Sequence, residues 1–260
     1  MTLEVWMGKN FDTSYEREAV GRFLDDMEFR FGDEEKLHLV LMDYYIENRQ
    51  IDLTALKNDA IITIELKECH EPFLASENGD WCTPSGHIVG SKDRNPFQQV
   101  QECRIKWFNL LKANKHKFRC FEKATNDKPF WYSTCIVAIS PSLHPNTTNK
   151  ISSDSWWFRL FGLDELAKQI EFQTNKYMNF SDDELRKIAS DLLSLKQKSY
   201  KTRKNITEWE NKLKEREKRL ENREMEIKEK ELAKREELLG YQEAALKKWA
   251  DELQKAKKSL

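Results

Sequence analysis

The spacing of apolar residues is helical near the N-terminus and then changes to that of strands. A helix is predicted by apolar side chains at Val20, Phe23, Leu24 and Met27. Gly32 ends it. Three strands are predicted by the runs rich in β-branched and aromatic residues at 37–45, 50–56 and 60–67. Because Asn58-Asp59 is a turn signal, the pattern predicts a helix followed by an antiparallel meander.

Residues 68–94 follow as a long irregular insertion that contains several glycines and prolines. A helix then begins at Asn95-Pro96, since asparagine is a preferred N-cap and proline suits the first helical position. A strand at 133–140 and helices at 163–172 and 182–195 come next, the last capped by Ser181. The order α-β-β-β-α-β predicts an α/β fold with a mixed central sheet flanked by helices.

The composition changes near residue 200. All six prolines and seven of the eight glycines lie before residue 163, and more than half of the residues from 201 onward are charged. We therefore divide the chain into a domain at 1–198 and a long charged α-helix at 199–260. A heptad repeat predicts that this helix forms a coiled coil, with core positions at Ile206, Leu213, Leu220 and Ile227, then Leu232, Leu239, Leu246, Leu253 and Leu260.

A coiled coil over residues 206–260 would join copies of the chain into a homo-oligomer. Arg216 and Arg223 occupy core positions and weaken the repeat. Two alternatives therefore stay open: a single solvated helix, and a hairpin that bends near Gly240.

The N-terminus has no basic start before an apolar run, and no stretch of about 18 apolar residues occurs, so we expect neither secretion nor a membrane span. An odd number of scattered cysteines, five, indicates reduced thiols and a cytoplasmic location. The net charge of -1 does not by itself indicate a polyanion binder.

Basic residues are nevertheless concentrated in one segment. Residues 101–150 contain 9 Lys and Arg against 3 Asp and Glu, whereas residues 1–100 contain 10 against 20. Such a segment would suit contacts to phosphates, and the other interpretation is a solvated helix face and loop. The residues concerned are Arg104, Lys106, Lys112, Lys115, Lys117 and Arg119.

The hairpin of residues 50–67 brings candidate chemistry together. A turn centred between Asn58 and Asp59 places Asp52 opposite Glu65, and side-chain alternation turns Lys67 to the same face. Opposed carboxylates are destabilising unless a cation compensates them, and two carboxylates suit Mg²⁺ or Mn²⁺. The alternative is a surface hairpin with an ordinary Glu-Lys pair.

Four segments follow one another along the chain: Gln50-Ile51-Asp52, Ile64-Glu65-Leu66-Lys67, Trp81 and Asn95-Pro96-Phe97-Gln98-Gln99. Together they resemble the pattern of the nuclease-related domain (NERD), a branch of the PD-(D/E)xK superfamily, over roughly residues 14–140. The resemblance implies a restriction-endonuclease-like fold with an αβββαβ core. It also implies that Asp52, Glu65 and the Leu66 carbonyl bind the metal ion, that Lys67 is the catalytic lysine and that Gln99 is the motif glutamine.

An acidic residue of the first helix often joins such sites, and helical phase favours Glu16 over Glu18, because Glu16 shares the apolar face. The other role for Glu16 is the last position of a capping box, Thr13-Ser14-Tyr15-Glu16. Gln99 would lie in the first turn of its helix, where free N–H groups favour an anion, and Gln98 and Gln101 are possible substitutes.

Two further clusters have simpler interpretations. The spacing of Cys69, His70, Cys82 and His87 does not match the usual paired zinc ligands. Aromatic residues at Trp156, Trp157, Phe158 and Phe161 could stack on bases, but burial against the preceding strand is the preferred interpretation.

The resulting hypothesis is an endonuclease that hydrolyses DNA with Mg²⁺ or Mn²⁺ and restricts phage or plasmid DNA. The defence role rests on the resemblance alone. The alternatives are a nuclease that acts on RNA, and a non-catalytic scaffold that binds nucleic acid and oligomerises through its coiled coil.

Overall fold

The computed structural model describes residues 3–9, 14–32, 34–91, 93–198 and 218. The chain divides into two units, Met1–Tyr200 and Lys201–Leu260, and every element named here belongs to the first. The coiled coil and homo-oligomer predicted for residues 206–260 lie outside the described residues, apart from Lys218. Thr13 of the predicted capping box also lies outside them. No described helix is long and apolar enough to cross a membrane.

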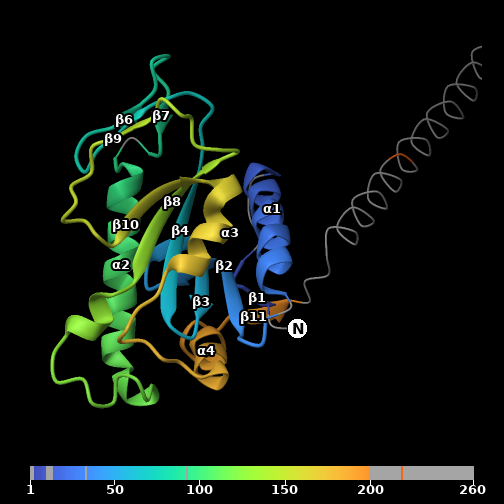
Figure 1. Cartoon of the computed structure of the whole chain (residues 1–260), viewed down its shortest axis with the longest axis vertical. Coiled ribbons are helices and arrows are strands. Elements are labelled where there is room, and N and C mark those ends of the chain that lie inside the picture. Colours follow the sequence, from blue (N-terminus) through green and yellow to red (C-terminus); the bar gives the residue numbers. More distant parts are fainter. Residues whose placement is uncertain (1–2, 10–13, 33, 92, 199–217, 219–260) are drawn as a thin grey trace, which may run out of the picture. The chain divides into compact units, whose positions relative to one another are not determined.

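A mixed sheet of seven strands forms the centre of the first unit, in the order β10-β8-β4-β3-β2-β1-β11 (Figure 1). The strands β2, β3 and β4 are the predicted antiparallel meander, whereas β1 pairs in parallel with β2, and β8 in parallel with β4 and β10. The strands are β1 (Leu3–Met7), β2 (His38–Ile46), β3 (Arg49–Lys57), β4 (Ala60–Glu68), β8 (Thr134–Ser140), β10 (Phe158–Gly162) and β11 (Lys196–Lys198).

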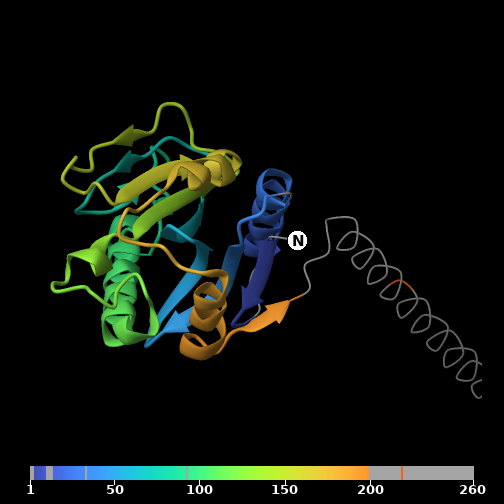
Figure 2. The ribbon, with the colours of Figure 1, turned by 60° about the horizontal axis from the view of Figure 1, so that its bottom comes forward.

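Helices cover both faces of this sheet (Figures 1 and 2). Helices α1 (Ser14–Phe31) and α3 (Leu163–Phe172) pack on one face, over a core that includes Ile62, Ile64 and Leu66 of β4. Helix α2 (Pro96–Ala113) packs on the other face and joins β4 to the parallel strand β8. Successive side chains of β4 point to opposite faces of the sheet, so they pack in two different hydrophobic cores.

The predicted α/β class and mixed sheet are confirmed, but the predicted αβββαβ order omits three strands of the sheet. Strands β1 and β11 have five and three residues, too few for a clear period of two. Strand β10 begins inside the aromatic run and follows a long connection from β8, so no local pattern identified it.

The helix predicted at 182–195 is too long. Helix α4 (Asp182–Lys187) is followed by a wider turn, η3 (Ile188–Leu192), and the chain then reverses to form β11. A positive φ of 53° at Ser194 makes the reversal, while Leu185, Ile188 and Ala189 fill the core beside α2. The predicted cap Ser181 is confirmed, and it forms a capping box because Ser181 and Glu184 exchange hydrogen bonds.

The insertion between β4 and α2 contains three two-residue strands, β5 (Leu74–Ala75), β6 (Trp81–Cys82) and β7 (Ile88–Val89). Strand β5 pairs with β9 (Thr148–Asn149), and β6 pairs with β7. The fully buried Trp81 stacks on Phe73 and donates a hydrogen bond of 2.8 Å to the Ser76 carbonyl. The insertion is thus a packed layer over one end of the sheet, next to the start of α2 (Figure 1).

Candidate active site

The β3–β4 hairpin has the predicted register up to the residue before the candidate site. Leu53 stands opposite Ile64 and Lys57 opposite Ala60, as a turn at Asn58-Asp59 requires. The pairing ends at Leu53, so Asp52 and Glu65 are not the directly opposed pair that we predicted. Instead, Asp52 Oδ2 accepts a hydrogen bond of 2.9 Å from the Leu66 N–H.

The regular alternation of β3 breaks at Asp52. Leu53 packs in the core under α1, whereas Ile51 packs in the core under α2, so the residues on either side of Asp52 face opposite interiors. The same change occurs in β2 between Met42 and Tyr44, around Asp43, whose φ is 41°. Aspartate tolerates this left-handed conformation better than most residues. Asp52 therefore lies where the paired strands separate.

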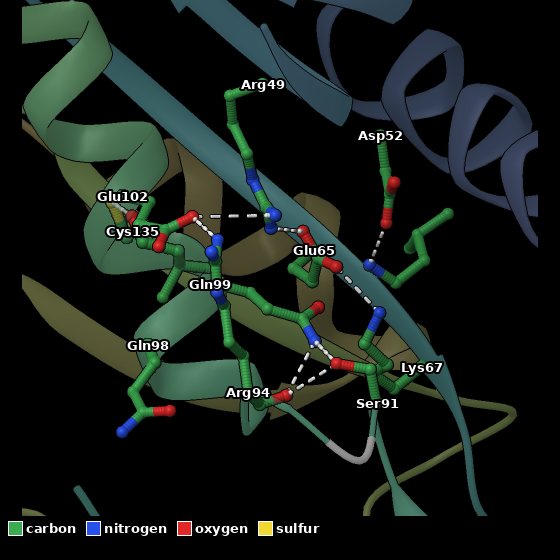
Figure 3. Close-up of polar contacts among 12 residues, drawn as sticks. Arg49, Asp52, Glu65, Lys67, Ser91, Arg94, Gln98, Gln99, Glu102 and Cys135 are labelled. Carbon is green, nitrogen blue, oxygen red and sulfur yellow. Dashed lines mark hydrogen bonds and ion pairs between the residues drawn. The ribbon is translucent and has the colours of Figure 1, made fainter.

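Glu65 lies between two cations (Figure 3). Its Oε1 accepts a hydrogen bond of 2.6 Å from Lys67 Nζ, and its Oε2 is 3.9 Å from Arg49 NH2. The side chains of Glu65 and Lys67 are only 7% and 19% exposed. Arg49 also forms an ion pair of 3.6 Å with Glu102, which Arg94 contacts as well. Glu65 is thus held by charge on both sides.

Asp52 is compensated less well. Burial and the neighbouring Glu65 carboxylate raise the pKa of Asp52 to about 7, while Lys67 and the Leu66 N–H oppose the shift. Asp52 forms no ion pair within the described residues. For Lys67, burial by itself would lower the pKa, but Glu65 and Asp52 outweigh it and raise the pKa. Lys67 is therefore a protonated cation at neutral pH.

The candidate metal ligands fit a hard divalent cation. Asp52 and Glu65 interact electrostatically, and carboxylate oxygens are ligands of the kind that Mg²⁺ and Mn²⁺ prefer, whereas the Leu66 carbonyl stays a predicted ligand. The raised pKa of Asp52 indicates negative charge that an added cation would stabilise. No group of three or more His, Cys, Asp or Glu side chains suited to a metal occurs in the described part of the chain.

The structure separates the two first-helix candidates. Glu16 is partly buried, and its charge contributes to the raised pKa of both Asp52 and Tyr15. Glu18 is exposed and forms an ion pair of 2.6 Å with Arg22. Helical phase therefore identified the acidic side chain that lies near Asp52.

Gln99 is buried in the first turn of α2, and its amide nitrogen donates hydrogen bonds to the Arg94 carbonyl at 2.9 Å and to Ser91 Oγ (Figure 3). The alternatives are placed elsewhere. Gln98 forms the capping box with Asn95, and Gln101 is exposed.

Sequence reasoning missed Arg49, Ser91, Arg94 and Glu102. Arg49 lies three residues before Asp52 and could have been noticed as a cation beside the acidic motif. Ser91 and Arg94 belong to the irregular insertion, where no periodic pattern indicates which way each side chain points. Glu102 could not be distinguished by sequence from the other charged residues of α2.

The four possible zinc ligands have other environments. Cys69 donates to the Glu71 carbonyl, His70 pairs with Glu68 at 3.5 Å, and Cys82 and His87 are exposed. The basic segment is partly neutralised, since Lys106 pairs with Glu47 and Lys112 with Asp127.

The geometry defines an α/β protein with a charged site where two central strands separate. Residues 15–137 match the family model of the nuclease-related domain, NERD, a range that starts in α1 and ends in β8. The protein thus carries a nuclease-related domain, as the sequence motifs indicated. No curated protein and no solved structure matches the chain. The family match suggests a nuclease-related function and contact with nucleic acid.

Proposed function

We propose that the protein is a Mg²⁺- or Mn²⁺-dependent endonuclease that hydrolyses phosphodiester bonds of DNA. The observation that carries this proposal is the convergence of Asp52, Glu65 and Lys67 where β3 and β4 separate, within the matched domain. A restriction-endonuclease-like reaction centre uses these residue types, as the resemblance in the sequence implies. Defence against phage or plasmid DNA, in the cytoplasm, is the biological role that we propose on the same resemblance.

Asp52, Glu65 and the Leu66 carbonyl would hold the metal ion. When bound, the ion supplies positive charge that polarises a phosphodiester and lowers the pKa of a water molecule. Asp52, whose pKa is about 7, would lose its proton on taking up this role, and the Leu66 N–H would hold its carboxylate in place.

Lys67 contributes as a fixed cation. Because its pKa is raised, its ammonium stays protonated and does not act as a general base. It would donate hydrogen bonds to the attacking water or to a phosphate oxygen, and so stabilise negative charge that develops in the transition state. Glu65 fixes its position through the 2.6 Å contact.

Gln99 and Glu16 have supporting roles in this proposal. The Gln99 amide nitrogen is held by the Arg94 carbonyl, which orients its side chain at the N-terminus of α2. Glu16 adds negative charge near Asp52 and would favour binding of a cation there. If the tail at 206–260 assembles copies of the chain, two sites would be available for the two strands of a duplex.

A cleavage assay of the full chain tests the proposal. The substrates are supercoiled plasmid, linear duplex, single-stranded DNA and RNA, each with Mg²⁺, Mn²⁺ or EDTA. We expect metal-dependent cleavage of DNA, and a loss of about 100-fold or more in Glu65→Gln. The matched control is Glu68→Gln, an exposed glutamate at the end of the same strand, which should cleave like the wild type. Equal activity of Glu65→Gln and wild type would reject the site. Cleavage of RNA alone would assign the substrate to the alternative class.

A further inference from the structure

A second cluster of polar and aromatic side chains lies beside α2, outside the candidate active site. The ring of Trp131 at the end of η2 (Lys128–Trp131) stacks on Phe108 of α2, with ring centres 4.0 Å apart. Tyr132 contacts both Trp156 and Tyr177, each at 4.8 Å between ring centres. We call Trp131, Tyr132, Trp156 and Tyr177 the aromatic platform.

The platform is accessible to a ligand. Trp156 is 45% exposed, and the other three rings are partly exposed. Burial was predicted for the whole run from Trp156 to Phe158, and it holds for Trp157 and Phe158, which are 6% and 5% exposed. It is wrong for Trp156, because Trp157 fills the space against α2 and leaves its neighbour at the surface just before β10.

Arg104 of α2 lies at the centre of this cluster. Its guanidinium is 4.7 Å from the ring centre of Trp157, 5.1 Å from that of Trp131 and 5.4 Å from that of Trp156. One terminal nitrogen donates to the Trp131 carbonyl, whereas the buried Nε has no hydrogen-bond partner. Among the described residues, no carboxylate forms an ion pair with Arg104.

A partly buried cation without an anionic partner is costly, and cation–π contacts offset only part of that cost. Burial lowers the pKa of Arg104, and no neighbouring carboxylate opposes this effect. An anionic group of a ligand could therefore form an ion pair with the Arg104 guanidinium.

Two more cations border the rings. Lys176 Nζ lies 5.2 Å from the ring centre of Tyr177, and Arg159 of β10 donates hydrogen bonds to the carbonyls of Trp156 and Phe158. Neither forms an ion pair in the part of the chain that the structure describes. The Glu77 carboxylate contacts the preceding residues instead, where it accepts hydrogen bonds from the Ser155 hydroxyl at 2.9 Å and from the Ser152 N–H.

We propose that the aromatic platform and its three cations, Arg104, Arg159 and Lys176, bind single-stranded nucleic acid. Exposed rings provide surfaces on which unpaired bases stack, and unopposed cations bind the phosphates between them. Charge complementarity selects this ligand over an apolar partner surface, which would leave the cations unneutralised. A duplex fits less well because its bases are already stacked and paired.

Binding of fluorescent dT12 and rU12 oligonucleotides to the full chain in EDTA, measured by anisotropy, tests this proposal without any cleavage. We expect Trp156→Ala to weaken binding about tenfold. The matched control Phe172→Ala removes another exposed ring, 62% exposed on α3, and should bind like the wild type. Lys176→Ala should reduce the salt dependence of binding by about 0.7 in the log–log slope, while the exposed Lys168→Ala should not.

Comparison of dT12 with rU12 shows which kind of strand the platform prefers, and either preference supports the proposal. Equal binding of dT12 by wild type and Trp156→Ala overturns it, as does the absence of binding by the wild type, which would leave the surface to a protein partner. Because this binding is measured in EDTA, where no metal-dependent cleavage occurs, failure of the platform is distinguishable from failure of the active site.

Photocross-linking of the wild type to an oligonucleotide that contains bromodeoxyuridine gives a readout that needs no variant. Cross-links at Trp131, Tyr132, Trp156 or Tyr177 support the proposal, and cross-links only at other residues contradict it.

Discussion

Two regions beside α2 contain buried charge, and they differ in how that charge is compensated. In the candidate active site, the Glu65 carboxylate lies between Lys67 and Arg49. In the aromatic platform, the Arg104 guanidinium is surrounded by indole rings, without an ion pair in the described part of the chain. The first region is largely neutralised from within, and only Asp52 has no ion pair among the described residues. The second region contains a cation without a carboxylate partner, which is why we propose an anionic ligand for it.

The largest expected effect separates the two regions by activity. Lys67→Met should reduce the rate of metal-dependent DNA cleavage by about 100-fold, because the transition state loses a fixed cation. Arg104→Met should leave the rate on short duplexes within about twofold if the platform binds only single strands. Single-turnover cleavage rates measure both variants. Equal losses in the two variants would contradict the division into two regions.

The second effect concerns stability. Lys67→Met leaves the Glu65 carboxylate with the more distant Arg49, so we expect a loss of about 2 kcal/mol in the free energy of unfolding. The value is below that of a fully buried pair because Lys67 is partly exposed and Arg49 remains. Urea denaturation in EDTA measures it, with Lys67→Arg as the control that keeps the charge. No difference between the two variants would show that the ion pair contributes little.

The third effect is a pH dependence. The pKa of Asp52 is raised to about 7, so between its ordinary value and pH 7 the folded protein holds a proton that the unfolded chain has released. The free energy of unfolding therefore falls as pH rises through this window, by up to about 1.4 kcal/mol per unit. In EDTA, the wild type should lose more stability between pH 5 and about 7 than Asp52→Asn. Identical pH profiles would contradict the raised pKa.

The smallest effect is expected at the platform. Arg104→Met removes a cation that has no carboxylate partner, so no opposite charge is left buried. The variant loses the hydrogen bond to the Trp131 carbonyl, but the methionine side chain costs less free energy to bury than the guanidinium. The free energy of unfolding should change by less than about 1 kcal/mol. A loss in urea denaturation as large as that of Lys67→Met would mean that Arg104 mainly stabilises the fold.

Local signals predicted the parts of the fold that short segments determine. The Asn58-Asp59 turn fixed the β3–β4 register, and Asn95-Pro96 marked the start of α2, where Asn95 and Gln98 form a capping box. Strands β1, β10 and β11 were missed because their positions depend on partners distant in sequence. Helical phase was enough to place Glu16 nearer to Asp52 than Glu18, because α1 is regular.

The details of the site depend on contacts that no local pattern specifies. The break in alternation at Asp52 accompanies the positive φ of Asp43 on a neighbouring strand, and so the predicted opposition of Asp52 and Glu65 was wrong in detail. Arg49 reaches Glu65 and Glu102 across two elements. The rings that contact Arg104 of α2 come from η2 and from the segment before β10, and only tertiary packing brings these elements together.

The central claim is that Asp52 and Glu65 hold a divalent cation, and Mn²⁺ binding followed by electron paramagnetic resonance tests it most directly. At pH 8 the full-length wild type should remove free Mn²⁺ from solution at a site that Asp52→Asn and Glu65→Gln both lose and that Glu68→Gln retains. Equal Mn²⁺ binding by all four proteins would contradict the account.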